Sequence, residues 1–243
     1  MKKDYNFGYT KVNPKQKTKL VQNVFSSVAP NYDIMNDLMS LGMHRLWKKR
    51  FVETVDLKEN EIILDVGSGS GDIASEILKD NLSTSLYLLD LNEEMLLEGR
   101  KRLRKEKNIK YFIGNAEKLN FENNFFDKYT ISFCLRNVTE YLLSIKEAYR
   151  VLKPGGKYCC LEFSTPKSSL VSSSYKIYKS KILPLLGELV AKDKNAYKYL
   201  SESIDLFPSQ EELSKNLRDC GFTKVETINL FNGIVAIHTG YKL

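Results

Sequence analysis

The stretch LDVGSGSGD, residues 64–72, constrains the fold more than any other part of the chain. An apolar run rich in Ile, Leu and Val ends there, three glycines alternate with small residues, and a helix-like segment follows. In an open α/β sheet, a loop that joins a strand to a helix in this way lies at the carboxyl ends of the strands, where ligands bind. Gly67, Gly69 and Gly71 let the backbone turn tightly and approach a ligand closely.

The rest of the chain continues this alternation of strands and helices. Apolar runs rich in β-branched residues predict strands, and amphipathic segments between them predict helices. The expected strands cover residues 61–66, 85–90, 109–114, 126–133 and 157–163, and the expected helices cover 71–80, 92–106 and 142–152. In the tail, two strand-like runs flank residues 231–233 with no helix between them, which predicts an antiparallel hairpin at the sheet edge. We therefore expect a doubly wound α/β fold with a seven-stranded, mostly parallel sheet.

A chain of 243 residues can bury one sizeable core, and we predict a single domain over residues 21–243. Residues 1–20 carry lysines but no apolar stretch, so we expect a flexible, basic lead-in and no secretory signal. The longest apolar runs are too short to span a membrane. The four cysteines form no C-x-x-C pair, which indicates neither a zinc site nor a disulfide framework and fits a reducing, cytoplasmic compartment.

The residues around the glycines favour a cationic ligand over a phosphate. The spacing G-x-G-x-G matches neither the dinucleotide fingerprint nor a P-loop, and Asp65 and Asp72 would repel a phosphate. The same carboxylates would attract an ammonium or sulfonium group. Asp90 ends the second strand, where a carboxylate can accept both hydroxyls of a ribose. A ribose joined to an amino-acid cation, without phosphate, describes S-adenosylmethionine.

Later strand ends add candidate contacts to this cofactor. Asn115 and Ala116 follow the third strand and are placed to bracket an adenine ring. Ser132 lies at the end of the fourth strand and would face the same crevice. Taken alone, Asp90 could be a turn residue and Ser132 a surface hydroxyl. The ordered set on successive strand ends is more specific than any one of its members.

Two longer stretches carry a resemblance to a known family. Residues 32–47, YDIMNDLMSLGMHRLW, and residues 150–164, RVLKPGGKYCCLEFS, resemble the two signatures of the ubiquinone/menaquinone biosynthesis C-methyltransferase family. LRNV at 135–138 also matches, and the core is similar to the Rossmann-like class I S-adenosylmethionine-dependent methyltransferases. The family's glycine loop often reads GGTGD, whereas this chain has GSGSGD. Ser70 keeps the hydroxyl and Gly69 is retained, so we expect cofactor binding to survive.

The resemblance implies C-methylation of a hydroquinol with a polyprenyl tail. The acceptor would be 2-methoxy-6-polyprenyl-benzoquinol or demethylmenaquinol, and no residue decides between them. Arg136 and Asn137 follow the fourth strand, beside the expected methyl donor. Because arginine stays protonated, we interpret Arg136 as a cation that stabilises the phenolate, with Asn137 fixing a water or a ring oxygen. Glu162, at the end of the fifth strand, is a candidate proton acceptor. The alternatives are a structural ion pair for Arg136 and a structural hydrogen bond for Glu162.

The first signature predicts a helical cap over the crevice and a site for the quinol. Its candidate substrate contacts are Tyr32, Met35, Asn36 and His44. Met35 belongs to a methionine stripe that by default packs in a core, although methionines also adapt to flexible apolar ligands. His44 is one of only two histidines, and a structural role competes with a role as a base.

A polyprenyl tail implies contact with a membrane surface. Residues 168–192 mix apolar residues with lysines, as in a helix that touches a membrane or forms a dimer, and ordinary core packing is the competing interpretation. We expect a cytoplasmic protein, associated peripherally with the inner membrane, that acts as a homodimer or within a quinone-biosynthesis complex.

Two other functions stay open from the sequence. One is a methyltransferase that acts on RNA or another small acceptor, because the net charge is +7. The basic residues are spread along the chain without an aromatic–basic motif, so we expect no nucleic-acid partner. The other is a non-catalytic cofactor-binding scaffold, which the intact glycine loop, Asp90 and Arg136 argue against.

Overall fold

The computed structural model describes residues 4–29, 32–80, 83–166, 168, 175, 178 and 194–243. Within these residues, seven strands form one sheet in the order β5-β4-β3-β6-β7-β9-β8. The strands are β3 (Ile62–Val66), β4 (Ser85–Asp90), β5 (Ile109–Ile113), β6 (Phe126–Ser132), β7 (Leu152–Phe163), β8 (Thr223–Leu230) and β9 (Val235–Tyr241). The order reverses direction between β3 and β6, which is the switch point where α/β sheets bind ligands.

Pairing within the sheet confirms the predicted topology. β5, β4, β3, β6 and β7 run parallel to one another, and β9 is antiparallel to both β7 and β8. The tail therefore forms the predicted edge hairpin, with the short helical turn η6 (Phe231–Gly233) between its strands. Helices α4 (Asp72–Ile77), α5 (Glu93–Arg102) and α6 (Tyr141–Val151) occupy the predicted connections.

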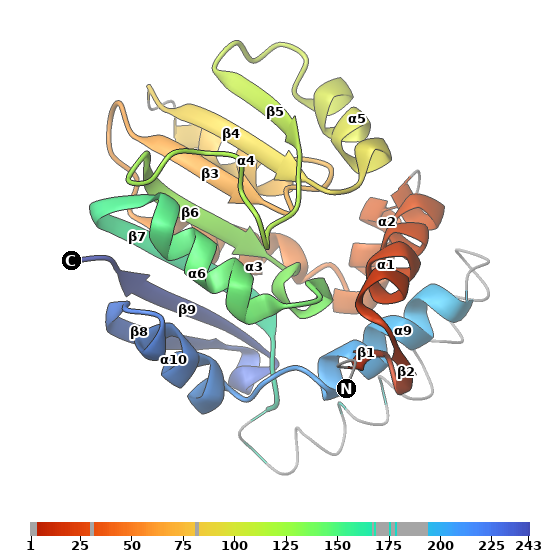
Figure 1. Ribbon diagram of the computed structural model, residues 1–243. Coiled ribbons are helices and arrows are strands. Elements are labelled where there is room, and N and C mark those ends of the chain that lie inside the picture. The colour runs from red at the N-terminus through yellow and green to blue at the C-terminus, as the bar shows by residue number, and fades with distance from the viewer. Residues whose placement is uncertain are drawn as a thin grey trace.

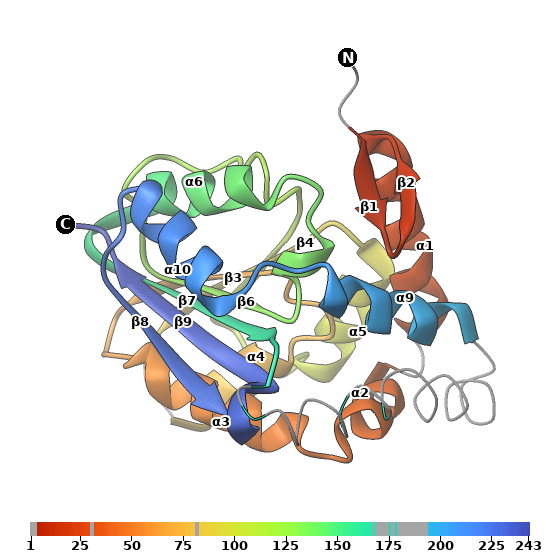
Figure 2. The ribbon, with the colours of Figure 1, turned by 90° about the horizontal axis from the view of Figure 1, so that it is seen from below.

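Helices cover both faces of the sheet (Figure 2), with α6 and α10 (Gln210–Asp219) on one face and α3 (His44–Val55) and α4 on the other. The side chains of each parallel strand alternate between the two resulting cores. On β4, Leu88 packs in the core with α3 and α4, whereas Leu89 packs in the core with α6 and α10. Because both faces are buried, the strands read as continuous apolar runs, which made them easy to predict.

Residues 4–20, within the segment 1–20 that was predicted to be a flexible lead-in, contain two strands and the start of a helix. Two short strands, β1 (Tyr5–Phe7) and β2 (Thr10–Val12), form a hairpin, and α1 (Pro14–Val28) begins immediately after it. Asn13 caps α1, because its side chain accepts from the Gln16 backbone N–H at 2.9 Å while the Gln16 side chain accepts from the Asn13 N–H at 3.2 Å. The sequence NPKQ encodes this start through local capping, which outweighs the basic, polar composition of the segment.

Helices α1 and α2 (Tyr32–Ser40) lie beyond the carboxyl ends of β3, β4 and β6 (Figure 1). Helix α9 (Lys194–Asp205) lies beside the N-terminal hairpin. Within the described residues, no helix is both long and apolar enough to cross a bilayer. Residues 169–174, 176–177 and 179–193, which include most of the predicted membrane or dimer segment, lie outside the described part of the chain.

His238 on β9 should make the protein sensitive to acid. It is 2% exposed, its Nε2 lies 3.3 Å from the Gln210 carbonyl oxygen, and burial lowers its pKa from 6.5 to about 4. His238 therefore becomes protonated below about pH 6.5 in the unfolded chain, but only below about pH 4 in the folded chain. We expect the free energy of unfolding to fall by up to about 3 kcal/mol over this interval.

Urea unfolding at several pH values, compared between the wild type and His238→Gln, isolates this effect. Other titrating groups contribute equally to both proteins and cancel in the difference. If the two proteins lose stability in parallel between pH 7 and pH 4, the buried imidazole is not the cause.

Candidate active site

The glycine loop after β3 is held against β4. The N–H groups of Gly67 and Ser68 donate to the Leu89 carbonyl oxygen at 2.7 and 3.2 Å. Gly67 has a φ of 64°, and a Cβ atom there would lie 2.2 Å from the Cys134 Sγ. Gly71 has a φ of 79°, and a Cβ atom there would lie 2.8 Å from the Leu103 side chain. Both glycines are thus required by conformation and by close approach.

Asp90, at the end of β4, organises this loop. Its Oδ2 accepts from the Gly69 N–H and its Oδ1 from the Asn92 N–H, each at 2.8 Å. Burial raises the pKa of its carboxyl group, while the backbone donors oppose that shift. A carboxylate offers about four acceptor positions. Two of them are used here, so Asp90 can still accept hydrogen bonds from hydroxyl groups of a ligand.

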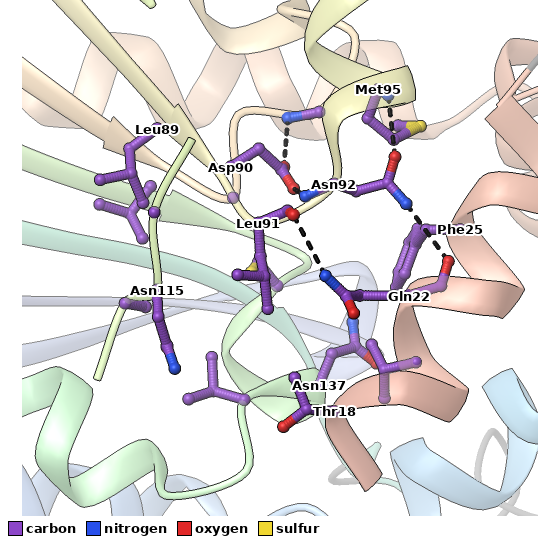
Figure 3. Close-up of a pocket in the computed structure, with 18 of the residues that line it drawn as sticks. Thr18, Gln22, Phe25, Leu89, Asp90, Leu91, Asn92, Met95, Asn115 and Asn137 are labelled. Carbon is purple, nitrogen blue, oxygen red and sulfur yellow. Dashed lines mark hydrogen bonds between the residues drawn. The ribbon is translucent and has the colours of Figure 1, made fainter. Parts of the chain in front are cut away.

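A cavity opens at this point between the strand ends and the N-terminal helices (Figure 3). Its empty volume, which includes the space at its open mouth, is about 790 Å³. The predicted cofactor residues that line it are Gly67, Gly69, Asp90, Asn115, Ala116 and Ser132. Residues from four separate strand ends therefore meet at one cavity, as the sequence predicted.

Three predicted cofactor residues, Asp65, Ser70 and Gly71, are not among those that line the cavity. Gly71 is the N-cap residue of α4, and the buried Ser70 Oγ has no partner among the described residues. Asp65 is 1% exposed on β3, and its Oδ1 accepts from the Thr130 hydroxyl at 2.8 Å. Its Oδ2 has no hydrogen-bond donor in the described structure, and burial raises the pKa of this carboxyl to about 7. A cationic group nearby would relieve that unfavourable burial.

Asp72 does not present its charge as the sequence suggested. Its carboxylate forms ion pairs with Lys48 from α3 and with Arg102 from α5, and Arg102 also pairs with Asp33 of α2 at 2.5 Å. The pKa of Asp72 is lowered because these cations outweigh its desolvation by burial. The residue therefore joins helices together, and its charge is already neutralised by the protein.

Helix α1 supplies a wall of the cavity that was not predicted from the sequence. Thr18, Gln22 and Phe25 line the cavity from this helix. Gln22 Nε2 donates to the Leu91 carbonyl oxygen at 3.3 Å, and Asn92 Nδ2 donates to the Gln22 carbonyl oxygen at 3.2 Å (Figure 3). The amphipathic pattern of residues 14–28 was the available signal, but such a pattern does not distinguish a cavity wall from core packing.

Asn92 connects helix α1 to the start of helix α5. Its replacement can separate its contact with α1 from its role as the cap of α5. Its Oδ1 caps α5 by accepting from the Met95 N–H at 2.9 Å, while its Nδ2 donates to Gln22 and to the Ser26 Oγ at 2.8 Å. Serine keeps the cap but is too short to reach α1, whereas alanine loses both contacts.

We expect Asn92→Ser and Asn92→Ala to weaken S-adenosylmethionine binding by about tenfold, and only Asn92→Ala to lose about 1 kcal/mol of stability as well. Calorimetric titration and urea unfolding measure the two effects. Wild-type affinity in Asn92→Ser would mean that the attachment of α1 does not support binding.

Arg136 and Glu162 form a buried ion pair next to the cavity. Arg136 lies in the short helix η3 (Leu135–Asn137), and its guanidinium lies 2.7 Å from Glu162 Oε1, with side chains 5% and 2% exposed. Glu162 also accepts from the N–H groups of Arg136 and Phe163 at 3.1 and 3.0 Å. Burial raises the pKa of Glu162, and Arg136 opposes the shift. The structural pairing considered from the sequence is thus present, and Glu162 is fully engaged.

Asn137 lines the cofactor cavity, whereas Arg136 lines a second cavity. Asn137 Nδ2 donates to the Phe133 carbonyl oxygen at 3.3 Å, and Arg136 donates to the same oxygen at 2.7 Å. The Arg136 Nε is buried without a partner in the described part of the chain. Arg136 therefore keeps donor capacity next to Asn137, although it lines the second cavity.

The first family signature, residues 32–47, lies partly on helix α2 beside the cavity and partly at the start of helix α3. Tyr32 lines the cavity from α2, and Asn36 is buried on the same helix with an Nδ2 that has no partner among described residues. His44 instead begins α3, where its Nε2 lies 2.8 Å from Asp37 Oδ1, and burial lowers its pKa. This contact favours the structural role for His44. The side chain of Met35 lies outside the described structure.

The sequence profile of the ubiE/COQ5 methyltransferase family matches residues 11–242. The chain belongs to this family. Proteins named ubiquinone/menaquinone biosynthesis C-methyltransferase UbiE are 49% identical in Rickettsia bellii and in Rickettsia prowazekii, over 98% of this chain and 98% of theirs. The protein of that name in Rickettsia rickettsii is 50% identical over 97% of this chain and 98% of its own.

Solved structures share the fold of this family member. A S-adenosylmethionine-dependent methyltransferase from Thermotoga maritima has a TM-score of 0.66 at 19% identity, over 92% of this chain and 100% of its own. Phosphoethanolamine N-methyltransferase 2 from Haemonchus contortus, solved with S-adenosylmethionine, has a TM-score of 0.60 at 17% identity, over 80% of this chain and 52% of its own. At these identities the similarity establishes the fold alone.

Family membership makes the chain an S-adenosylmethionine-dependent methyltransferase. The residues of the cavity fit that cofactor. Asp90 has acceptor positions left, the buried Ser132 Oγ has no partner among the described residues, and Gly67 and Gly69 line the cavity without side chains.

Proposed function

We propose that the protein transfers the methyl group of S-adenosylmethionine to a ring carbon of a polyprenylated hydroquinol in ubiquinone or menaquinone biosynthesis. The observation that carries this proposal is the 49–50% identity, along nearly the whole chain, to proteins named for that reaction. The acceptor would be 2-methoxy-6-polyprenyl-benzoquinol, demethylmenaquinol or both. Asn137 in the lining of the cofactor cavity, and the buried cation of Arg136 next to it in the chain, support quinol chemistry.

The cofactor would lie along the strand ends. Asp90 would accept the ribose hydroxyls, and Asn115 and Ala116 would bracket the adenine. The loop at Gly67 to Gly71, including Ser70, would hold the amino-acid end. Asp65 behind this loop would favour its positive charge, because its own carboxylate lacks a donor on Oδ2 among the described residues. Ser132 would face the cofactor near the reacting end.

The bound cofactor supplies an already activated methyl group on a sulfonium. The protein must align the acceptor and make a ring carbon nucleophilic, and alignment alone can supply several kcal/mol. A phenolic hydroxyl has a pKa of about 10. We assign Arg136 the role of a cation that lowers this pKa, and each unit is worth about 1.4 kcal/mol. Asn137 would donate to the ring oxygen or to an ordered water.

Glu162 would hold Arg136 in place and is a weaker candidate for proton acceptor, because Arg136 and two backbone N–H groups already occupy its oxygens. Tyr32 and Asn36 would contact the acceptor from the cap, together with Met35 of the same helix. His44 would support this cap through Asp37.

The acceptor's tail also leads us to propose peripheral contact with the inner membrane surface. Each buried methylene is worth about 0.8 kcal/mol, so the tail is difficult to extract from a bilayer. Co-sedimentation with anionic liposomes, compared between the wild type and a variant with Lys176, Lys179 and Lys181 neutralised, tests whether residues 168–192 contribute. Equal binding would show that those lysines do not contribute to the membrane contact.

Light scattering of the same two proteins without liposomes shows whether the protein forms a homodimer.

A turnover assay tests the proposed function. Purified protein receives labelled S-adenosylmethionine with reduced short-tail demethyl-benzoquinol, with demethyl-naphthoquinol or with RNA, in separate reactions. Label in either quinol is the expected result and identifies the acceptor. Calorimetry tests separately whether the cofactor binds. If it binds but label enters only RNA, or enters no acceptor, the proposed quinol substrate is refuted. Absence of cofactor binding would favour a scaffold.

A further inference from the structure

The side-chain amide of Asn137 is held by a residue far away in the chain. The Tyr199 hydroxyl, from α9, donates to Asn137 Oδ1 at 3.0 Å. The other end of the amide, Nδ2, donates to the Phe133 carbonyl oxygen at 3.3 Å. Both side chains are nearly inaccessible to water, because Tyr199 is 5% exposed and Asn137 is 7% exposed. A hydrogen bond in such an environment has few competitors.

The N-terminal hairpin fixes Tyr199 in turn. The ring of Phe7 on β1 stacks on the Tyr199 ring with centroids 4.3 Å apart and an angle of 15°. Tyr9, in the turn after β1, donates through its N–H to Glu202 at 3.1 Å and through its hydroxyl to Asp205 at 3.0 Å. Both acceptors lie on α9, so the N-terminal hairpin holds the helix that carries Tyr199 (Figure 2).

An asparagine amide needs such a partner to have a defined direction. Its oxygen and nitrogen are nearly equal in shape, yet one accepts and the other donates. The torsion that exchanges them is soft, so neighbouring groups decide which atom faces which way. Burial raises the pKa of Tyr199 above its ordinary value, so its hydroxyl keeps its proton and can donate. Because Nδ2 of Asn137 faces the Phe133 carbonyl oxygen, the atom left to accept from this hydroxyl is Oδ1.

We infer that Tyr199 is a positioning residue that orients the Asn137 amide so that an Nδ2 hydrogen is directed to the acceptor's ring oxygen. Nδ2 carries two hydrogens. One is used by the Phe133 carbonyl, and the described residues provide no partner for the other. Asn137 itself lines the cofactor cavity (Figure 3). The identity of the acceptor rests on the proposed function. The orientation of the Asn137 amide does not depend on it.

A double-mutant cycle tests the inference. Tyr199→Phe keeps the ring stacked on Phe7 and removes only the hydroxyl. We expect kcat with the quinol to fall by about five- to tenfold, equivalent to one hydrogen bond of about 1–1.4 kcal/mol, with unchanged KM for S-adenosylmethionine. In an Asn137→Ala background the same replacement should change nothing further. Tyr87→Phe is the matched control, because it removes a hydroxyl that accepts from Lys110 Nζ at 2.8 Å away from the cavity.

An equal loss of kcat from Tyr199→Phe in both backgrounds would overturn the inference, since the tyrosine would then act without Asn137. A second readout is independent of turnover. In protein labelled with ¹⁵N-asparagine, the side-chain amide signals absent from Asn137→Ala belong to Asn137. We expect Tyr199→Phe to shift or broaden them and Tyr87→Phe to leave them unchanged. Unaltered signals in Tyr199→Phe would overturn the inference even if no quinol is methylated, whereas altered signals without quinol turnover would refute only the proposed substrate.

Discussion

Replacement of Asp90 by asparagine is expected to weaken S-adenosylmethionine binding by about 10²–10⁴-fold. The carboxylate accepts from two backbone N–H groups, those of Gly69 and Asn92, and keeps acceptor positions for the ribose. An amide nitrogen in place of either oxygen would oppose a backbone donor and turn an acceptor of the ribose into a donor. Hydrogen bonds to charged groups contribute roughly 1.5–3 kcal/mol each, and two of them give the stated range.

Calorimetric titration of the cofactor measures this effect directly. Asp219→Asn is the matched control, because Asp219 is 58% exposed on α10, pairs only with Lys215 in the described structure and lies apart from the cavity. The thermal midpoint of each variant verifies that it is folded. Less than a threefold change in affinity for Asp90→Asn would mean that the cofactor does not use this carboxylate.

Replacement of the Arg136–Glu162 pair should separate stability from catalysis. Loss of Arg136 alone leaves the carboxylate of Glu162 buried without its cation, and we expect Arg136→Met to lose about 3–5 kcal/mol of stability. The double variant Arg136→Met with Glu162→Gln removes both charges at similar volume, so its stability should return close to that of the wild type. Its kcat should nevertheless fall by about 10²–10³-fold, the usual effect of removing a group that stabilises developing negative charge.

Urea unfolding and quinol turnover of the single and double variants give both quantities. Cofactor affinity should remain unchanged, since Arg136 borders the second cavity and not the cofactor cavity. A stable double variant with kcat within threefold of the wild type would show that Arg136 serves the fold alone. That result would restore the structural interpretation considered from the sequence.

The features that could be predicted from the sequence have local or periodic causes. Buried parallel strands read as apolar runs, and the glycine loop combines three positions that exclude side chains. The position of Asp90 and Ser132 at one cavity could be predicted because the strand ends of a parallel sheet meet at one edge.

The features that were missed depend on contacts between distant residues. Tyr199 and Asn137 are separated by 62 positions, and nothing near either residue marks the bond between them. The neutralisation of Asp72 needs Lys48 and Arg102 from two other helices. The start of helix α1 in the N-terminal segment could have been predicted. Asn13, Pro14 and Gln16 form a capping sequence that can be recognised without knowledge of distant contacts.

The position of the transferred methyl group tests the proposed reaction most directly. Cofactor carrying a ¹³C-methyl group is incubated with the protein and the reduced demethyl-quinol, and the product is examined by carbon NMR. We predict a single labelled methyl bound to a ring carbon, formed by the wild type and by Asp219→Asn and greatly reduced in the Arg136→Met, Glu162→Gln variant. A labelled methyl on a ring oxygen, or no label in any quinol while the cofactor binds, would contradict the assignment of this protein as a quinol C-methyltransferase.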